Sequence, residues 1–239
     1  MTGKPLKDRK IRRLRKAVTT RFPGLREGLI EGTARHLSAA LRRRFEAIDW
    51  TVEGHEEASA AIRRGPVILA IWHEAFLIAP FFAQNLPRQV ISLHDPSPAG
   101  RIGLLHAGTV GLDAVSVGRD GPDQRTVLRR MRQGAPIALA VDGPSGPARV
   151  VKPAVLDWAR TARAELVLFA AATDRSRRLP SWDRMIWPSG RRGLASFAPG
   201  PNLEGRGDAA RETARLALED AMIRHADDVE ERAGRMRRS

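Results

Sequence analysis

The stretch that decides the fold is VILAIWHEAFLIAPFFAQNLPRQVISLHD, which runs from Val67 to Asp95. It opens with a short run of apolar and β-branched residues, continues with a longer apolar segment of helical length, and closes with a second β-type run. Strand, helix and strand in this order predict a parallel βαβ unit. Both strands end in ionisable residues, His73-Glu74 after the first and His94-Asp95 after the second.

The same alternation continues along the rest of the chain. The pattern predicts strands at 48–53, 67–72, 89–93, 113–117, 136–141 and 165–172, with helices at 56–64, 74–84, 99–107, 122–133 and 153–163. Beyond Pro180 the Pro- and Gly-rich sequence indicates short irregular strands, and residues 207–232 predict a closing amphipathic helix. We therefore expect an α/β fold with a mostly parallel central sheet flanked by helices.

Length and composition bound the function classes. The chain has 239 residues, of which 42% are hydrophobic, so it can build a sizeable core as one domain with an appendage. It contains no cysteine. This excludes a disulfide framework, a thiolate metal site, an iron–sulfur cluster and a cysteine nucleophile. The scarcity of aromatic residues, 5% with no tyrosine, argues against a base-stacking RNA platform.

The positive charge is concentrated near the N-terminus. Residues 1–44 hold 14 Lys and Arg against 3 Asp and Glu, which is +11 of the net +14. Apolar residues at Ile11, Leu14 and Val18 have helical spacing, so we predict a basic amphipathic arm over 1–44 followed by a domain over 45–239. Such an arm suits an anionic membrane surface, although a solvated tail or nucleic-acid binding would have the same charge pattern.

Targeting signals are also absent from the sequence pattern. No apolar stretch and cleavage site follow the basic start, so we expect no signal peptide and a cytoplasmic protein. The segment 65–83 is apolar enough to suggest a membrane span, but His73 and Glu74 lie at its centre and Pro80 interrupts it. Ionisable groups at the bilayer centre are costly, so we predict a strand and a helix there instead.

Polar residues follow three of the predicted strands. Because ligands of parallel sheets bind at the carboxyl ends of the strands, His73, His94, Asp95 and Asp142 are expected at one edge. They combine a candidate general base, candidate carboxylate partners and a Gly-Pro loop in the sequence DGPSGP. Their spacing matches no known metal-ligand pattern, and no dinucleotide, P-loop, zincin or serine-hydrolase motif occurs. We therefore predict no metal site.

Four segments carry a resemblance to a known family. They are WHEAFL (72–77), ISLHD (91–95), VDGPSGPARVVKPAVLDWAR (141–160) and SWDRMIWP (181–188). In residue type, order and spacing they resemble a bacterial group of the lysophospholipid acyltransferase-like superfamily, which contains a DGPxGP box and has long been labelled a domain of unknown function. The resemblance covers approximately residues 67–201, and its DGPxGP and SWDR boxes are more specific than any single histidine.

The resemblance implies transfer of a fatty acyl group from acyl-CoA or acyl carrier protein to a hydroxyl of a lysophospholipid or glycolipid. His73 would be the general base, with Asp95 and Asp142 as further catalytic candidates. No cofactor beyond the donor substrate is implied, and we expect a protein held peripherally on the inner face of the cytoplasmic membrane, without a nucleic-acid partner. The candidate substrate-binding residues are Glu74, Arg119, Gly143, Pro144, Arg149 and Lys152.

One departure from the superfamily pattern concerns the carboxylate that orients the histidine. The superfamily motif places an aspartate five residues after the histidine, where this chain has Ile78. Glu74 is a poor substitute because consecutive side chains diverge at a strand-to-helix junction. We expect Asp95 or Asp142 to supply the carboxylate from a neighbouring strand end. The alternative is a non-catalytic relative that binds lipid or another anionic ligand.

Overall fold

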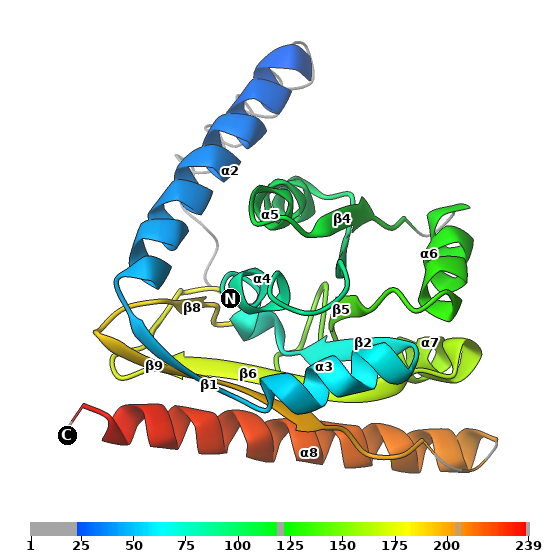
Figure 1. Cartoon of the computed structure of the whole chain (residues 1–239). Coiled ribbons are helices and arrows are strands. Elements are labelled where there is room, and N and C mark those ends of the chain that lie inside the picture. The colour runs from blue at the N-terminus through cyan, green and yellow to red at the C-terminus, as the bar shows by residue number, and fades with distance from the viewer. Residues whose placement is uncertain (1–22, 119–121, 204, 206, 238–239) are drawn as a thin grey trace, which may run out of the picture.

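The computed structural model describes residues 23–118, 122–203, 205 and 207–237, and its centre is a seven-stranded sheet (Figure 1). The strand order is β1-β9-β6-β2-β5-β3-β4. These strands are β1 (Asp49–Glu53), β2 (Val67–Ile71), β3 (Ile91–His94), β4 (Asp113–Ser116), β5 (Ile137–Ala140), β6 (Glu165–Thr173) and β9 (Arg192–Pro199).

The sheet is mostly parallel, as predicted. β6, β2, β5, β3 and β4 run in one direction, and their pairings with each other are all parallel. β9 pairs antiparallel with β6 and parallel with β1, so these two strands run the opposite way. Parallel neighbours need a crossover connection, and helices supply it here.

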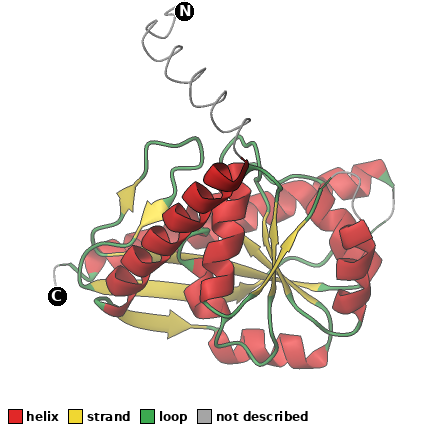
Figure 2. Ribbon diagram, turned by 90° about the horizontal axis from the view of Figure 1, so that it is seen from above, coloured by secondary structure: helices red, strands yellow, loops and turns green. Residues whose placement is uncertain are grey.

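Helices cover both faces of the sheet. Figure 2 shows them arranged around the twisted strands. They are α2 (Pro23–Glu46), α3 (His55–Arg64), the 3₁₀ helix η1 (His73–Ala75), α4 (Ala79–Ala83), α5 (Pro98–Thr109), α6 (Pro122–Arg132), α7 (Ala154–Ala162) and α8 (Asp208–Arg235). The predicted α/β architecture is therefore correct.

The side chains of β2 point alternately to the two faces of the sheet, and each face has its own layer of the core. Ile68 and Ala70 belong to the layer covered by α6, α7 and α8. Val67, Leu69 and Ile71 belong to the layer covered by α3, α4 and α5. All five strand residues are buried, as expected for a strand covered on both faces. The C-terminal half of the chain thus closes one face, with α8 running along the sheet in Figure 1.

One predicted helix is wrong in its extent. The helix expected at 74–84 is divided into η1, a turn, and the five-residue α4. Pro80 lies in the first turn of α4, where its missing N–H is tolerated, whereas further inside one continuous helix it would break the hydrogen-bond ladder. No helix in the described part of the chain is both long and apolar enough to span a bilayer.

The helix α2 crosses the predicted boundary between residues 44 and 45. Leu41 is fully buried with Leu77, Phe81 and Val110 in a third hydrophobic cluster. Ser38 of α2 also contacts Nδ1 of the buried His106 on α5 at 3.0 Å. The described part of the predicted arm therefore contributes to the core, while residues 1–22, which hold the densest basic run, lie outside the described residues.

A small hairpin stands apart from the main sheet. Its strands are β7 (Arg177–Arg178) and β8 (Ile186–Trp187), which pair antiparallel. Leu179, Met185 and Trp187 of this hairpin pack against the cluster that contains Leu41 of α2. Of the strands beyond Pro180, only the two-residue β8 is short as predicted, whereas β9 is an eight-residue strand of the main sheet; β7 begins slightly before Pro180.

Candidate functional site

His73 is the first residue of η1, directly after β2 and Trp72. β3 and β5 are close neighbours of β2 in the sheet and run parallel to it. Their carboxyl ends therefore meet at the same edge, which brings His94 and Asp142 to the side of the sheet where His73 lies. The predicted gathering of the three strand ends is confirmed.

The imidazole of His73 is held by a carboxylate from a distant part of the chain. Its Nδ1 lies 3.0 Å from Oδ2 of Asp183, which is in the loop between β7 and β8. An ionised carboxylate can only accept, so Nδ1–H donates and the neutral ring leaves Nε2 free of its proton. Asp183 is buried, at 3% exposure, and also accepts a hydrogen bond from the Ser181 hydroxyl. The pair has the base-and-orienter geometry of a catalytic dyad.

Rings and a glycine fix the position of the imidazole. Phe76 stacks on His73 with ring centroids 4.9 Å apart and planes 4° from parallel. Trp182 approaches it at 5.3 Å, tilted by 46°. A Cβ at Gly143 would lie 2.8 Å from Cδ2 of His73, so only glycine leaves the ring in this place. The His73 side chain stays 18% exposed, and Nε2 makes no hydrogen bond with any described residue.

Asp142 fixes the backbone of the site. Its Oδ1 accepts from the backbone N–H of His73 at 2.8 Å, and its Oδ2 accepts from that of Arg149 at 3.0 Å. Burial raises the pKa of this carboxyl, while the two backbone N–H groups lower it. Asp142 therefore joins the start of η1 to the end of the DGPSGP loop. The carboxylate that contacts the imidazole is Asp183, which corrects the expectation that Asp95 or Asp142 would do so.

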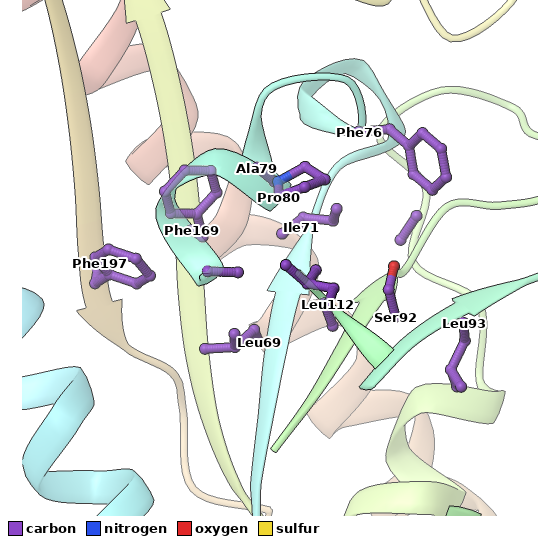
Figure 3. A pocket seen from close by; sticks show the side chains of 13 residues that line it. Leu69, Ile71, Phe76, Ala79, Pro80, Ser92, Leu93, Leu112, Phe169 and Phe197 are labelled. Carbon is purple, nitrogen blue, oxygen red and sulfur yellow. The ribbon is translucent and has the colours of Figure 1, made fainter. Parts of the chain in front are cut away.

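An apolar cavity is lined in part by Phe76, which stacks on His73 (Figure 3). Its lining also includes Leu69, Ile71, Ala79, Pro80, Ala83, Ser92, Leu93, Leu112, Ala138, Ala140, Phe169 and Phe197.

Comparisons with known proteins find similarities in sequence and in structure. No family model matches the chain. The uncharacterized protein RP090 of Rickettsia prowazekii (strain Madrid E) is 30% identical over 126 residues, which are 51% of this chain and 57% of that protein. The match thus spans little more than half the length of that relative. The crystal structure of the 1-acyl-sn-glycerophosphate (LPA) acyltransferase PlsC from Thermotoga maritima aligns with a TM-score of 0.49 and 12% identity, over 83% of this chain and 82% of that one.

His94 and Asp95 have local structural contacts at the end of β3. Nε2 of His94 lies 2.9 Å from the Ser92 hydroxyl, and its Nδ1 is buried without a hydrogen-bond partner. Burial lowers the pKa of His94 to about 4, so the ring is neutral at pH 7. Oδ1 of Asp95 accepts from the backbone N–H of Ser97, the residue that caps α5. Asp95 forms no hydrogen bond with His73.

Glu74 and Arg149 belong to a network of ion pairs. Glu74 is buried, at 8% exposure, and its carboxylate pairs at 2.8 Å with both Arg149 and Arg178. On the other side, Arg149 pairs with Asp227 at 2.6 Å and Arg178 with Glu230 at 2.6 Å, both on α8. Burial lowers the pKa of Arg149, but the carboxylates of Glu74 and Asp227 raise it by more. Substrate binding by Glu74 and Arg149 stays a prediction, and their contacts favour a structural role.

The remaining predicted residues lie in or near the DGPSGP loop. The Gly143–Pro144 and Gly146–Pro147 peptide bonds are cis. Lys152 donates from Nζ to the Gly146 carbonyl and from its backbone N–H to Val141, so it closes this loop. Arg119, also predicted to bind substrate, lies outside the described residues. In the described part of the chain, no group of three or more His, Asp or Glu residues is arranged to hold a metal ion.

Three residues of the site were missed as site residues by sequence reasoning: Phe76, Trp182 and Asp183. Asp183 lies 110 positions after His73 and does not follow a strand of the main sheet, so the rule of strand ends cannot find it. The available signal was the SWDR box, which was part of the family resemblance. The acid of this box, Asp183, would have been the residue to test in a chain with Ile78 at the expected acid position.

Proposed function

We propose that this chain is an O-acyltransferase that moves a fatty acyl group from acyl-CoA or acyl carrier protein to a hydroxyl of a lysophospholipid or glycolipid. The observation that carries the proposal is the His73–Asp183 pair, a partly exposed imidazole oriented by a buried carboxylate beside an apolar cavity. The resemblance of the WHEAFL, DGPSGP and SWDR segments to the acyltransferase-like superfamily supports the same reaction.

The proposed chemistry uses His73 as a general base. Its Nε2 takes the proton of the acceptor hydroxyl as the hydroxyl oxygen attacks the thioester carbonyl. The carbon–sulfur bond then breaks, and the departing thiolate recovers the proton from the imidazolium. Asp183 stabilises the imidazolium and keeps Nδ1 protonated throughout. General base catalysis of this kind contributes about 10²–10⁴-fold to the rate.

The apolar cavity is the proposed site of the acyl chain. Its walls are apolar apart from Ser92, and burial of methylene groups there contributes about 0.8 kcal/mol each. Phe76 both lines the cavity and stacks on His73, so we place the acyl chain in the cavity with its thioester carbonyl toward His73. We further propose that the protein works at the inner face of the cytoplasmic membrane, where both the lipid acceptor and the donor are present.

The experiment is acyl transfer from radiolabelled acyl-CoA and acyl carrier protein into a total bacterial lipid extract. Wild type is compared with His73→Ala. Label that enters a lipid only with the wild type supports the proposal, and the labelled lipid identifies the acceptor. Failure of transfer with both donors, by a folded protein that still binds vesicles, would contradict it and favour the non-catalytic alternative.

A further inference from the structure

The segment that carries Asp183 has an unusual surface. This segment, residues 174–192, includes β7 and β8 and is called the hairpin lobe below. It contains six arginines and two aspartates. Arg178 is used in the ion-pair network with Glu74. Four others are exposed, and their guanidiniums form no ion pair or hydrogen bond with any residue that the structure describes; they are Arg175, Arg177, Arg184 and Arg191.

The arginines of α8 differ from these four. α8 also contains five arginines, and each of them pairs with a carboxylate. On α8 the arginine charges are therefore balanced by neighbouring carboxylates. On the hairpin lobe, by contrast, Asp183 is buried against His73, and the four unpaired arginines face solvent. Such a surface attracts an anionic partner.

The hairpin lobe also exposes an indole. Trp182 is 42% exposed, and no other tryptophan of the chain is among the exposed large hydrophobic residues. Its ring is held in place, because a Cβ at Gly146 would meet it at 2.5 Å and the His73 ring lies 5.3 Å from it. A fixed, exposed tryptophan among arginines is the residue combination that favours the boundary between headgroups and acyl chains.

We propose that the hairpin lobe is a docking surface for an anionic lipid bilayer and holds the opening at His73 against the membrane. The orientation of the protein on the bilayer follows from Trp182. This exposed side chain borders the partly exposed imidazole, so a bilayer that contacts Trp182 lies next to His73. A nucleic acid would also attract the arginines, but it would not require a fixed, exposed indole beside the imidazole.

The lobe is also connected to the helix that follows the basic N-terminal residues. Leu179 and Met185 of the lobe pack against the cluster that contains Leu41 of α2. Residues 1–22, which precede α2 in the sequence, contribute nine further Lys and Arg. The lobe is therefore a second lipid contact, separate in sequence from the predicted arm and rigidly attached to the site.

The first test compares two charge-matched double variants of the full chain on vesicles of phosphatidylcholine with one quarter phosphatidylglycerol. Arg177→Gln/Arg184→Gln removes two charges from the lobe. Arg125→Gln/Arg129→Gln removes two exposed charges from α6, which lies on the opposite side of the molecule from β8 (Figure 1). The lobe variant is expected to lower the partition coefficient at low salt on the order of tenfold, and the control to lower it less than twofold.

Equal loss in both double variants would overturn the inference, because it would show that only net charge matters. So would salt-sensitive RNA binding that the lobe variant abolishes while vesicle binding is unchanged. These measurements need no acyl donor. A protein that binds through the lobe but transfers no acyl group would contradict the proposed function and leave this inference intact.

The second test locates the indole in the bilayer. Vesicles that contain brominated phosphatidylcholine quench tryptophan fluorescence only at short range. Wild type is expected to be quenched on binding, and Trp182→Phe to lose most of that quenching while its far-UV circular dichroism is unchanged. Quenching that is the same in Trp182→Phe would overturn the inference, since another tryptophan would then be the one in the membrane.

Discussion

At the residue scale, the site depends on which atom of His73 is left free. Asp183 accepts a hydrogen bond from Nδ1–H, Asp142 accepts one from the backbone N–H, and Gly143 leaves room for the ring. Together they direct Nε2 outward as the basic atom of the neutral imidazole. The carboxylate need not come from the same helical turn as the histidine, and here the place five residues on is taken by the buried Ile78.

His94 gives a prediction about stability and pH. Its pKa falls from 6.5 to about 4 on folding because the ring is buried. The unfolded chain therefore binds more protons between these values, and the free energy of unfolding decreases as pH falls from 6.5 toward 4. When the pH is lowered from 7 to 5, this residue alone should reduce the free energy of unfolding by about 2 kcal/mol. Urea unfolding at both pH values measures it.

The matched variant for this prediction is His94→Gln. Burial also lowers the pKa of His106, and it raises that of Asp142, which acts in the opposite direction. Both residues are present in the variant as well, so the difference in pH dependence between the two proteins isolates His94. An identical change from pH 7 to pH 5 in both proteins would show that His94 does not titrate as described.

The candidate site was predictable in part. His73 and Asp142 follow buried strands, and the rule that parallel strands meet at one edge was sufficient to bring them together. Asp183 was out of reach of that rule, because it lies in a hairpin outside the main sheet. Arg149 was misleading in isolation, since a guanidinium suited to phosphate is equally suited to Glu74 and Asp227.

At the element scale, the ion pairs of Glu74 connect three segments of the site. Glu74 is on η1, Arg149 follows the DGPSGP loop, and Arg178 is on β7 at the base of the hairpin that carries Asp183. Asp227 and Glu230 attach this network to α8. The network thus fixes the hairpin relative to the end of β2, and the distance from His73 to Asp183 depends on it.

We predict that Glu74→Gln lowers the free energy of unfolding on the order of 2–3 kcal/mol, because two largely buried guanidiniums lose the carboxylate between them. The control is Glu165→Gln, which breaks the exposed pair with Arg64 and should cost less than about 0.5 kcal/mol. Urea unfolding of both variants measures the difference. Equal stability of the two variants would mean that the network contributes no more than a surface pair.

Most element types followed from periodicity. The strands from β1 to β6 and the helices α3, α5, α6 and α7 lie within a few residues of their predicted positions, because each pairs a clear hydrophobic pattern with a Gly or Pro boundary. The segment after β2 was the exception, since an apolar run long enough for one helix is divided around Pro80. Apolar content alone cannot distinguish these outcomes.

At the scale of the whole molecule, the N-terminal region has two parts with different roles. The described core contacts of α2 begin at Ile30 and include Ala34 and Leu41. Removal of residues 1–22 should therefore leave the free energy of unfolding within about 1 kcal/mol, whereas removal of 1–44 deletes Leu41 and should cost at least 2–5 kcal/mol. Thermal unfolding of the two truncated chains measures this.

The shorter truncation should also weaken binding to anionic vesicles, because it removes nine basic residues. A chain without 1–22 that unfolds like the one without 1–44 would contradict the division at α2.

The sheet order illustrates what was beyond sequence reasoning at this scale. β9 lies between β1 and β6 and reverses the direction of that edge, and such pairing is decided by tertiary contacts that no local pattern records.

The central claim is that Asp183 orients His73 for acyl transfer, and the most direct test is the rate of transfer by Asp183→Asn. Asparagine keeps the size of the side chain but loses the charge that holds Nδ1 protonated. With unchanged circular dichroism, the rate should fall by about 10²–10⁴-fold, toward that of His73→Ala. A folded Asp183→Asn protein that transfers acyl groups at the wild-type rate would contradict the account.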